Sequence, residues 1–478
     1  MTNISLLLVG LALFLGVTLE FIPSMSWQGG PVANAMVWHD RQRIEQIILL
    51  VGTSAGMLVL WRVKLLESLN QLPRASLVLL LAGFSLGACS AGMSMYSRLA
   101  WLEWSTLLLL LTLAFLLAHE AVRAQSRFDV WAVRLLVLLA TVIALRVLMG
   151  YLAAMLEGIR LDSVKLFTSV VSNRRVFGQV ATMLIPLLAY PILRPDWAKG
   201  QRAGLMALLA VWWMLAVASG TRGTWMALGV SSVLLATVAW RQAWPWLRIQ
   251  LIALSLGLLL YGLMFVWLPV IFYPDAMVEN RLGNLVGLSG RETIWLASLV
   301  QIQAHPWLGI GPMHLAAILG HNASHPHNVV LQLAAEWGVP AALALLIPMV
   351  CGLIALLRRI RLNASPLLLS LTAALLGASA QAMVDGVLVM PYTQIWLVFV
   401  MGWAMGVYFR DASVKDAGRW MLGRISMILV SVMMALALSL LLYGVFPEIL
   451  HRAEYTKAYL DAGHNAIPPR YWMVGPIP

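Results

Sequence analysis

Long apolar runs alternate with short polar segments along almost the whole chain of 478 residues. A helix that crosses a bilayer needs about 20 mostly apolar residues, and the chain lacks the polar–apolar alternation that is typical of strands. The pattern predicts an all-α, polytopic integral membrane protein with 12–13 transmembrane helices and a long outer loop that carries short helices. The predicted spans are residues 3–22, 46–62, 76–96, 100–119, 130–150, 176–194, 203–219, 224–240, 249–272, 329–356, 365–384, 392–409 and 425–446.

Composition supports the membrane assignment and excludes one class of partner. The chain is 61% hydrophobic and 11% charged, whereas soluble domains carry about 25% charged residues. Its net charge of +12 could indicate a nucleic-acid-binding protein. The basic residues, however, are spread between the apolar runs and form no basic domain. We therefore expect contact with membrane lipids and no binding of nucleic acid.

Lys and Arg residues predict the orientation of the spans. Just over half of the 32 basic residues fall in one set of alternate loops, and loops enriched in this way usually lie inside the cell. This places the N-terminus inside and the tail 447–478 outside. The other 14 basic residues fall on the outer side, and seven of them lie in three outer segments, 159–179, 219–224 and 273–328: Arg160, Lys165, Arg174, Arg175, Arg222, Arg281 and Arg291.

Arginines concentrated on the outer side suggest an anionic ligand there. Arginine binds phosphate through two parallel hydrogen bonds, and its burial near a membrane is costly without a counter-ion. The alternative is that these side chains extend to lipid headgroups, and we favour that reading for Arg160, Lys165 and Arg281. Arg222 stands in the short turn SGTRGTW between two glycines, so a ligand could approach its backbone closely.

Clustered histidines stand before an apolar run in the segment ASHPHNVVLQLAAEWGVPA, residues 323–341. His321, His325 and His327 could form a zinc site, but no Cys and few acids lie near them. A single catalytic imidazole at the start of a helix is the better reading, since histidine exchanges a proton near neutral pH. Pro326 and Asn328 would fix the turn and satisfy donors at the helix end.

Other polar segments do not indicate a metal or a cofactor. The run GIGP, residues 309–312, predicts a tight turn and not a phosphate loop, because no GxxxxGK[ST] motif is present. No DxD or DxE pair occurs in an outer loop. Asp385, near the outer end of the span 365–384, could pair with an arginine of the site, bind the acceptor, or simply end a helix at the interface.

Residues 327–338, HNVVLQLAAEWG, resemble the signature of the O-antigen ligase superfamily: His, then Asn, Ser or Gln, nine residues, then Gly. The small residue or Tyr expected three positions later is here Ala341, a mild departure from the usual Gly, Thr or Tyr. Four further strings, all before residue 327, are similar to family segments and occur in the same order, so that the resemblance covers about residues 160–410, half of the chain. They are NRRVFGQ (173–179), SGTRGTW (219–225), SGRETIW (289–295) and HPWLGIGP (305–312).

The resemblance implies a metal-independent glycosyltransferase of the bacterial inner membrane, without a cofactor. Such an enzyme moves a glycan from an undecaprenyl-pyrophosphate carrier to an acceptor hydroxyl at the periplasmic face. By matching positions, His327 becomes the candidate base, and Arg222 and Arg291 become candidates for holding pyrophosphate. The candidate substrate-binding residues are Arg174, Arg175, Gln179, His325, Asn328 and Asp385. Because the reaction needs no covalent intermediate, we expect inversion at the anomeric carbon.

Members of the superfamily differ in their acceptor. The amino-acid sequence of residues 327–338 is most similar to that of the protein O-oligosaccharyltransferases, which modify Ser or Thr of a pilin-like protein. An O-antigen ligase acting on the lipid A-core is a close alternative, followed by an O-antigen polymerase and, from another class, a transporter. Larger protein-modifying members carry a soluble C-terminal domain, whereas this chain has only about thirty residues after its last span.

The resemblance also suggests a division of the chain into four parts. Residues 1–158 would form an N-terminal transmembrane bundle, and residues 159–410 the ligase core with the periplasmic loop 273–328. Residues 411–446 would hold the last transmembrane helix, followed by the short periplasmic tail 447–478. We expect a helix over 447–461 and an irregular end built on PPRYW.

Overall fold

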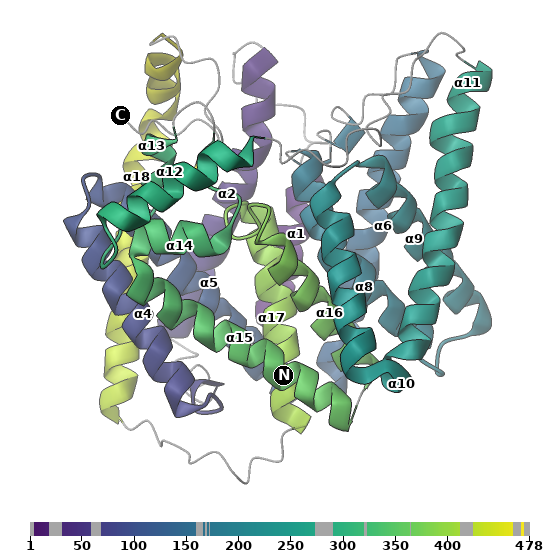
Figure 1. The fold of residues 1–478 in the computed structure, drawn as a ribbon, viewed down its shortest axis with the longest axis horizontal. Coiled ribbons are helices and arrows are strands. Elements are labelled where there is room, and N and C mark those ends of the chain that lie inside the picture. Colours follow the sequence, from purple (N-terminus) through teal and green to yellow (C-terminus); the bar gives the residue numbers. More distant parts are fainter. Residues whose placement is uncertain are drawn as a thin grey trace.

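The computed structural model contains helices and turns, with no strand among the residues that it describes (Figure 1). Those residues are 4–18, 31–58, 68–158, 166–167, 170–171, 173–272, 290–319, 323–363, 365–411, 424–461 and 470–472. The predicted all-α class is confirmed. Arg160, Lys165, Arg281 and His321, which the sequence singled out, lie outside the described residues.

Most helices follow the predicted apolar runs. In chain order they are α1 (Ile4–Thr18), α2 (Pro31–Gly56), α4 (Arg74–Met93), α5 (Ser97–Ala124), α6 (Ser126–Leu156), α8 (Arg174–Leu193), α9 (Lys199–Ala218), α10 (Arg222–Tyr261), η3 (Gly262–Trp267), α11 (Leu268–Phe272), α12 (Arg291–Ala304), α13 (Leu315–Ile318), α14 (Val329–Trp337), α15 (Val339–Leu362), α16 (Pro366–Gln381), α17 (Pro391–Asp411) and α18 (Arg424–Asp461).

Within the described residues, nine helical stretches are long and apolar enough to cross a membrane. Two shorter apolar helices, α1 and α16, accompany them. The predicted spans 224–240 and 249–272 fall in one continuous stretch, Arg222–Phe272. Its backbone leaves helical geometry at Ala239, with φ −147° and ψ 50°. Figure 1 shows this stretch descending, turning near the label α10 and rising again to α11, so it accounts for two crossings.

The prediction of one span over residues 329–356 is wrong. The chain breaks at Gly338, where φ is +85° and ψ is 157°, and α14 has only nine residues, about 14 Å of helix. A Cβ at Gly338 would lie 2.2 Å from the Trp307 carbonyl oxygen, so the loop backbone crosses the chain at a point that only glycine allows. Figure 1 shows α14 lying across the molecule beneath α12, with α15 descending from it.

The segment HPWLGIGP explains why α14 ends there. The amides of Ile310 and Gly311 donate to the carbonyls of Ala335 and Glu336, each at 2.9 Å. These carbonyls belong to the last turn of α14, where no helical partner is available. The predicted tight turn is thus confirmed by positive φ at Gly309 and Gly311, and this turn caps a helix.

Small residues allow the central helices α5 and α17 to pack closely. A Cβ at Gly402 would lie 2.7 Å from the Ala114 carbonyl oxygen, and one at Gly406 would lie 3.0 Å from that of Ala118. Close approach of this kind is how helices associate where both partners are apolar. Beside this contact, Arg410 at the end of α17 pairs with Asp129 of α6 at 2.8 Å, which fixes a third helix to the pair.

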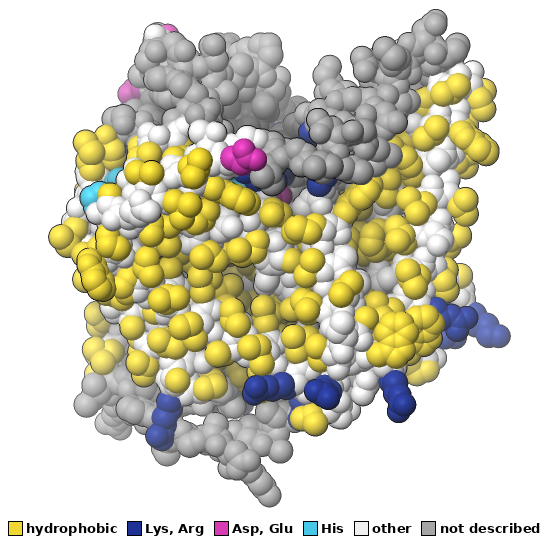
Figure 2. All heavy atoms as spheres, in the orientation of Figure 1, with side chains coloured by type: hydrophobic (Ala, Val, Ile, Leu, Met, Phe, Trp, Pro, Cys, Tyr) yellow, Lys and Arg dark blue, Asp and Glu magenta, His cyan; other side chains and the backbone are white. Residues whose placement is uncertain are grey.

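Apolar side chains form a broad band around the face shown in Figure 2. Lys and Arg side chains line the lower edge of the band (Figure 2). The helix α15, whose last turn carries Arg359 and Arg361, ends toward the same side in Figure 1. This distribution matches the basic edge that the sequence predicts for the inner side. The helices α12 and α14 lie toward the opposite edge (Figure 1), so the described part of the loop around α12 lies on the side predicted to be outer.

Candidate active site

Asn328 begins the helix that follows the histidines. Its side-chain oxygen accepts hydrogen bonds from the amides of Val330 and Leu331, each at 3.0 Å, as the predicted helix-end role requires. Its side-chain nitrogen donates to the Met383 carbonyl at 3.1 Å, and the Val329 amide donates to Ala382 at 2.9 Å. The start of α14 is therefore fixed to the turn that follows α16.

That turn carries Asp385 to the predicted base. The Nδ1 atom of His327 lies 3.8 Å from Oδ1 of Asp385, within ion-pair range but beyond a direct hydrogen bond. The Gly386 amide donates to the same carboxylate oxygen at 2.8 Å. Gln381 donates to the other carboxylate oxygen at 3.4 Å. Asp385 is 8% exposed, so its carboxylate is held in a fixed direction facing the imidazole.

The backbone of His327 adopts an unusual conformation. Its φ of +53° makes it one of three non-glycine residues with positive φ in the described part of the chain. This left-handed region costs an L-residue roughly 1–2 kcal/mol and tends to persist where surrounding contacts enforce it. The His327 amide donates to Nδ1 of His325 at 3.2 Å. The two rings meet nearly edge to face, with centroids 4.1 Å apart.

Three helices that approach the site begin with arginine. Arg174 and Arg175 start α8, Arg222 starts α10 and Arg291 starts α12. A helix N-terminus carries a partial positive charge, so a cation there is unfavourable for the helix by itself. An anion bound near these helix N-termini would be stabilised by both the helix dipoles and the guanidinium groups.

Packing between α8 and α10 brings two of these starts together. A Cβ at Gly178 would lie 2.4 Å from Oγ1 of Thr224 and 2.6 Å from that of Thr221. The two threonine hydroxyls bond to each other at 3.0 Å and flank Arg222. Because Gly178 lies one turn beyond Arg175, this close contact brings Arg222 to the side of α8 that carries Arg175.

The charged groups influence one another. Burial lowers the pKa of Arg291, Asp385 opposes that shift, and Arg175 and Arg222 reinforce it. Burial also raises the pKa of Asp385, against the effects of the Gly386 amide and of Arg175 and Arg291. The sequence proposed Arg175, Arg222, Arg291 and Asp385 from separate segments, and the fold brings their charges into one region.

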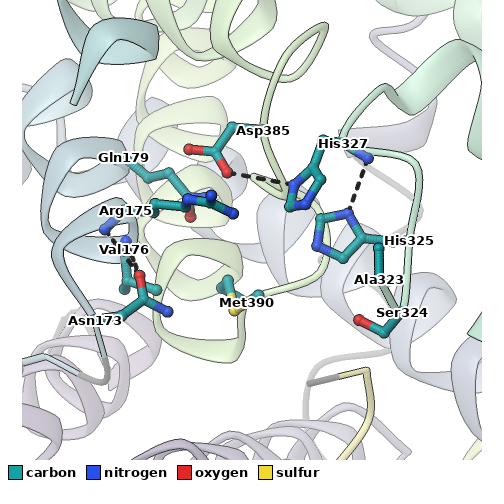
Figure 3. A pocket seen from close by; sticks show the side chains of 10 residues that line it. All are labelled: Asn173, Arg175, Val176, Gln179, Ala323, Ser324, His325, His327, Asp385 and Met390. Atoms are coloured by element: carbon teal, nitrogen blue, oxygen red, sulfur yellow. Dashed lines mark hydrogen bonds and ion pairs between the residues drawn. The ribbon is translucent and has the colours of Figure 1, made fainter. Parts of the chain in front are cut away.

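A cavity of about 140 Å³ lies between the histidine loop, the start of α8 and the turn after α16 (Figure 3). Its lining residues are Asn173, Arg175, Val176, Gln179, Ala323, Ser324, His325, His327, Asp385 and Met390. Figure 3 shows Arg175 and Gln179 on one side, facing Asp385 and the two imidazoles. Oε1 of Gln179 accepts a hydrogen bond from Thr393 at 2.7 Å, which fixes that amide beside the cavity.

Not every predicted site residue lines this cavity. Arg291 lies outside the lining but influences the pKa of His327 and Asp385, and Arg222 influences that of Arg291. Arg174 and Asn328 also lie outside the lining. Sequence reasoning missed Asn173, whose side chain accepts from the amides of Arg175 and Val176 at 2.8 and 3.0 Å. An Asn directly before a helical run was the available signal.

Among the described residues, no three His, Cys, Asp or Glu side chains form a possible metal site.

The imidazole of His327 is expected to be neutral near physiological pH. Burial lowers the pKa of His327 to about 3, and Arg175 and Arg291 add to the shift. A neutral imidazole can accept a proton, and the pH profile of kcat/KM reports the free enzyme. For the glycan transfer that the sequence resemblance implies, we expect kcat/KM to stay constant between pH 7.5 and 5, because protonation of His327 begins only well below that range. A fall centred near pH 6.5, the ordinary histidine value, would contradict this assignment.

One protein family resembles part of this chain. The model of the O-antigen ligase family matches residues 205–346, and no curated protein matches the chain. The matched segment runs from α9 into α15 and includes Arg222, Arg291 and His327. The strings from which the sequence suggested this family lie largely within it. Together with the all-helical membrane fold, this match supports the resemblance of the chain to the O-antigen ligase superfamily.

Proposed function

We propose that this membrane glycan transferase takes its glycan from an undecaprenyl-pyrophosphate carrier at the periplasmic face. The observation that carries the proposal is a cavity lined by Arg175, an imidazole and a buried carboxylate, with two further arginine-headed helix starts close enough for their charges to interact. A pyrophosphate would supply the negative charge that these starts favour. The donor's lipid chain would remain in the bilayer while its glycan enters the cavity.

His327 would act as the general base. The acceptor hydroxyl oxygen attacks the anomeric carbon and forms the new glycosidic bond, while the hydroxyl proton passes to His327 Nε2. The bond between the anomeric carbon and pyrophosphate breaks, and its electron pair leaves with the pyrophosphate oxygen. Nδ1 faces Asp385 across 3.8 Å, so the carboxylate would stabilise the imidazolium as it forms.

Arginines would stabilise the charge that develops on the leaving group. Electrostatic stabilisation by fixed donors is often the largest contribution to catalysis, and arginine clamps on phosphates are a recurring form. This arrangement requires no metal ion to neutralise pyrophosphate. Since attack and departure occur in one displacement, we propose inversion of the anomeric configuration. A product that keeps the donor's configuration would contradict the single-step mechanism.

Arg291 offers a direct test of the leaving-group assignment. We expect Arg291→Ala to reduce kcat/KM for the lipid-linked donor about 10²–10³-fold, because a charged group that stabilises the transition state is removed. Arg291→Lys keeps the charge but loses the planar pair of donors, so its activity should fall between those of the wild type and Arg291→Ala. Arg361→Ala, at the opposite end of the molecule, serves as the control. Equal donor kinetics in Arg291→Ala and Arg361→Ala would exclude the assignment.

The preferred acceptor is Ser or Thr of a pilin-like protein. It rests on the similarity of residues 327–338 to the protein-modifying branch. An O-antigen ligase that modifies the lipid A-core is the second candidate, and its support is the family whose model matches the chain. Deleting the gene and comparing the lipopolysaccharide ladder with the pilin mass in the same cells separates them. Loss of pilin glycan supports our preference, whereas loss of the ladder with unchanged pilin overturns it.

A further inference from the structure

We propose that His325 is a positioning residue that holds the backbone of His327 in its left-handed conformation and so directs the catalytic imidazole. The inference rests on the proposed function of His327 and assigns a different task to the other histidine. His325 is 3% exposed and lies within the loop that joins α13 to α14. The contacts around its ring carry the argument.

The Nδ1 edge of the His325 ring forms a hydrogen bond with the backbone of His327. Nδ1 accepts the His327 amide at 3.2 Å, a bond between a side chain and the amide two residues later. Asn and Asp side chains stabilise turns in the same way and favour left-handed backbone. Pro326 lies between the two histidines and has no amide to compete for this acceptor. The bond therefore offsets part of the cost of φ +53° at His327.

The proton on the His325 ring must then be on Nε2. Burial lowers the pKa of His325 well below its ordinary value, with His327 and Arg470 adding to the effect. A neutral ring with its proton on Nε2 leaves Nδ1 free to accept. The geometry and the charge state of His325 thus agree with the same role as an acceptor.

The other side of the ring rests against the turn that carries Asp385. A Cβ at Gly386 would lie 2.5 Å from Cε1 and 2.8 Å from Nε2 of His325. The His327 ring, with its centroid 4.1 Å away, packs against the same imidazole. His325 therefore touches both the base and the residue next to Asp385, and its size helps to set the distance between them.

Amide isosteres separate the positioning role from contact with substrate. In His325→Asn the amide oxygen falls near the position of Nδ1, whereas in His325→Gln the amide lies nearer Nε2. We expect His325→Asn to keep kcat within about threefold of the wild type. His325→Gln and His325→Leu should lose about 10²-fold in kcat, the scale of a misplacement of about 1 Å, while KM for the donor stays within twofold. A substrate contact through Nε2 would instead raise KM and favour Gln over Asn, which would overturn the proposal.

Gly386→Ala tests the same role without changing a titratable group. Its added methyl would press on the His325 ring, so we expect a similar loss of kcat with unchanged KM. Gly352→Ala, where an added Cβ meets no atom within 4 Å, is the matched control and should keep wild-type kinetics. Full activity of Gly386→Ala would contradict the proposed packing.

A readout that needs no turnover distinguishes failure of this inference from failure of the proposed function. Diethylpyrocarbonate modifies neutral, accessible imidazoles, and peptide mass spectrometry can follow the reaction at His327. We expect equal rates in the wild type and His325→Asn, and severalfold faster modification in His325→Gln and His325→Leu, whose loop is released. Unchanged rates in all four proteins would overturn the positioning role, whether or not the enzyme transfers glycan. A wild-type enzyme without transfer activity would instead refute the proposed function.

Discussion

His327→Ala is expected to lose nearly all glycan transfer while still binding the lipid carrier. General-base catalysis contributes about 10²–10⁴-fold to rate, and Nδ1 of the neighbouring His325 already accepts the His327 amide. The arginines that would hold pyrophosphate stay in place, so affinity for the carrier should change little. The measurements are kcat for transfer and equilibrium binding of the undecaprenyl-pyrophosphate donor to the same purified variant.

His451→Ala is the matched control for this substitution. His451 lies on α18, is exposed and pairs with Glu454 at 3.2 Å, so its loss should leave transfer unchanged. If His327→Ala retained most of its activity, the imidazole could not be the base. A transporter would give that outcome, because it needs no proton acceptor at this position and should lose activity only modestly.

Arg470→Met is expected to cause the largest loss of stability. Arg470 reaches from the C-terminal tail into the core, where it bonds Glu103 of α5 at 2.7 Å and Glu336 of α14 at 2.5 Å. All three side chains are buried. Burial raises the pKa of Glu336 and Arg470 opposes that shift. Removing one partner of a buried ion pair costs about 3–5 kcal/mol, which should appear as a lower melting temperature in detergent.

Two comparisons isolate the buried charges as the cause. Adding Glu103→Gln and Glu336→Gln to Arg470→Met removes the uncompensated carboxylates, so we expect part of the stability to return. Arg194→Met breaks an exposed pair with Asp196, and exposed pairs contribute little. A melting temperature for Arg470→Met equal to that of Arg194→Met would show that the tail does not stabilise the core.

The apolar runs predicted most of the fold because each crossing must satisfy its backbone within one helix. They could not predict the break at Gly338, since residues 329–356 form a single apolar run. The break arises where the backbone of Trp307 crosses 2.2 Å from the position of an added Cβ. Such a contact depends on a distant segment and leaves no mark on local hydropathy.

The residues of the candidate site could be proposed from the sequence where charged or titratable side chains stand out in an otherwise apolar chain. Arginines on the side predicted to be outer and an imidazole before a helix both pointed to it, as did the resemblance of residues 327–338 to the family signature. The roles of His325 and Gly386 depend on the angle between two turns, which the sequence does not encode locally. Arg470 lies 367 residues from Glu103 along the chain, so only the folded structure reveals their pairing.

The most direct test of the central claim is transfer by the purified enzyme in liposomes that contain an undecaprenyl-pyrophosphate-linked glycan, with a pilin-like acceptor outside. Product mass, anomeric configuration and released undecaprenyl pyrophosphate are measured together for the wild type and for His327→Ala. The proposed mechanism predicts one released carrier for each glycan transferred, with inverted configuration, and almost no product from His327→Ala. Movement of the carrier across the bilayer without transfer, or equal product from both proteins, would contradict it.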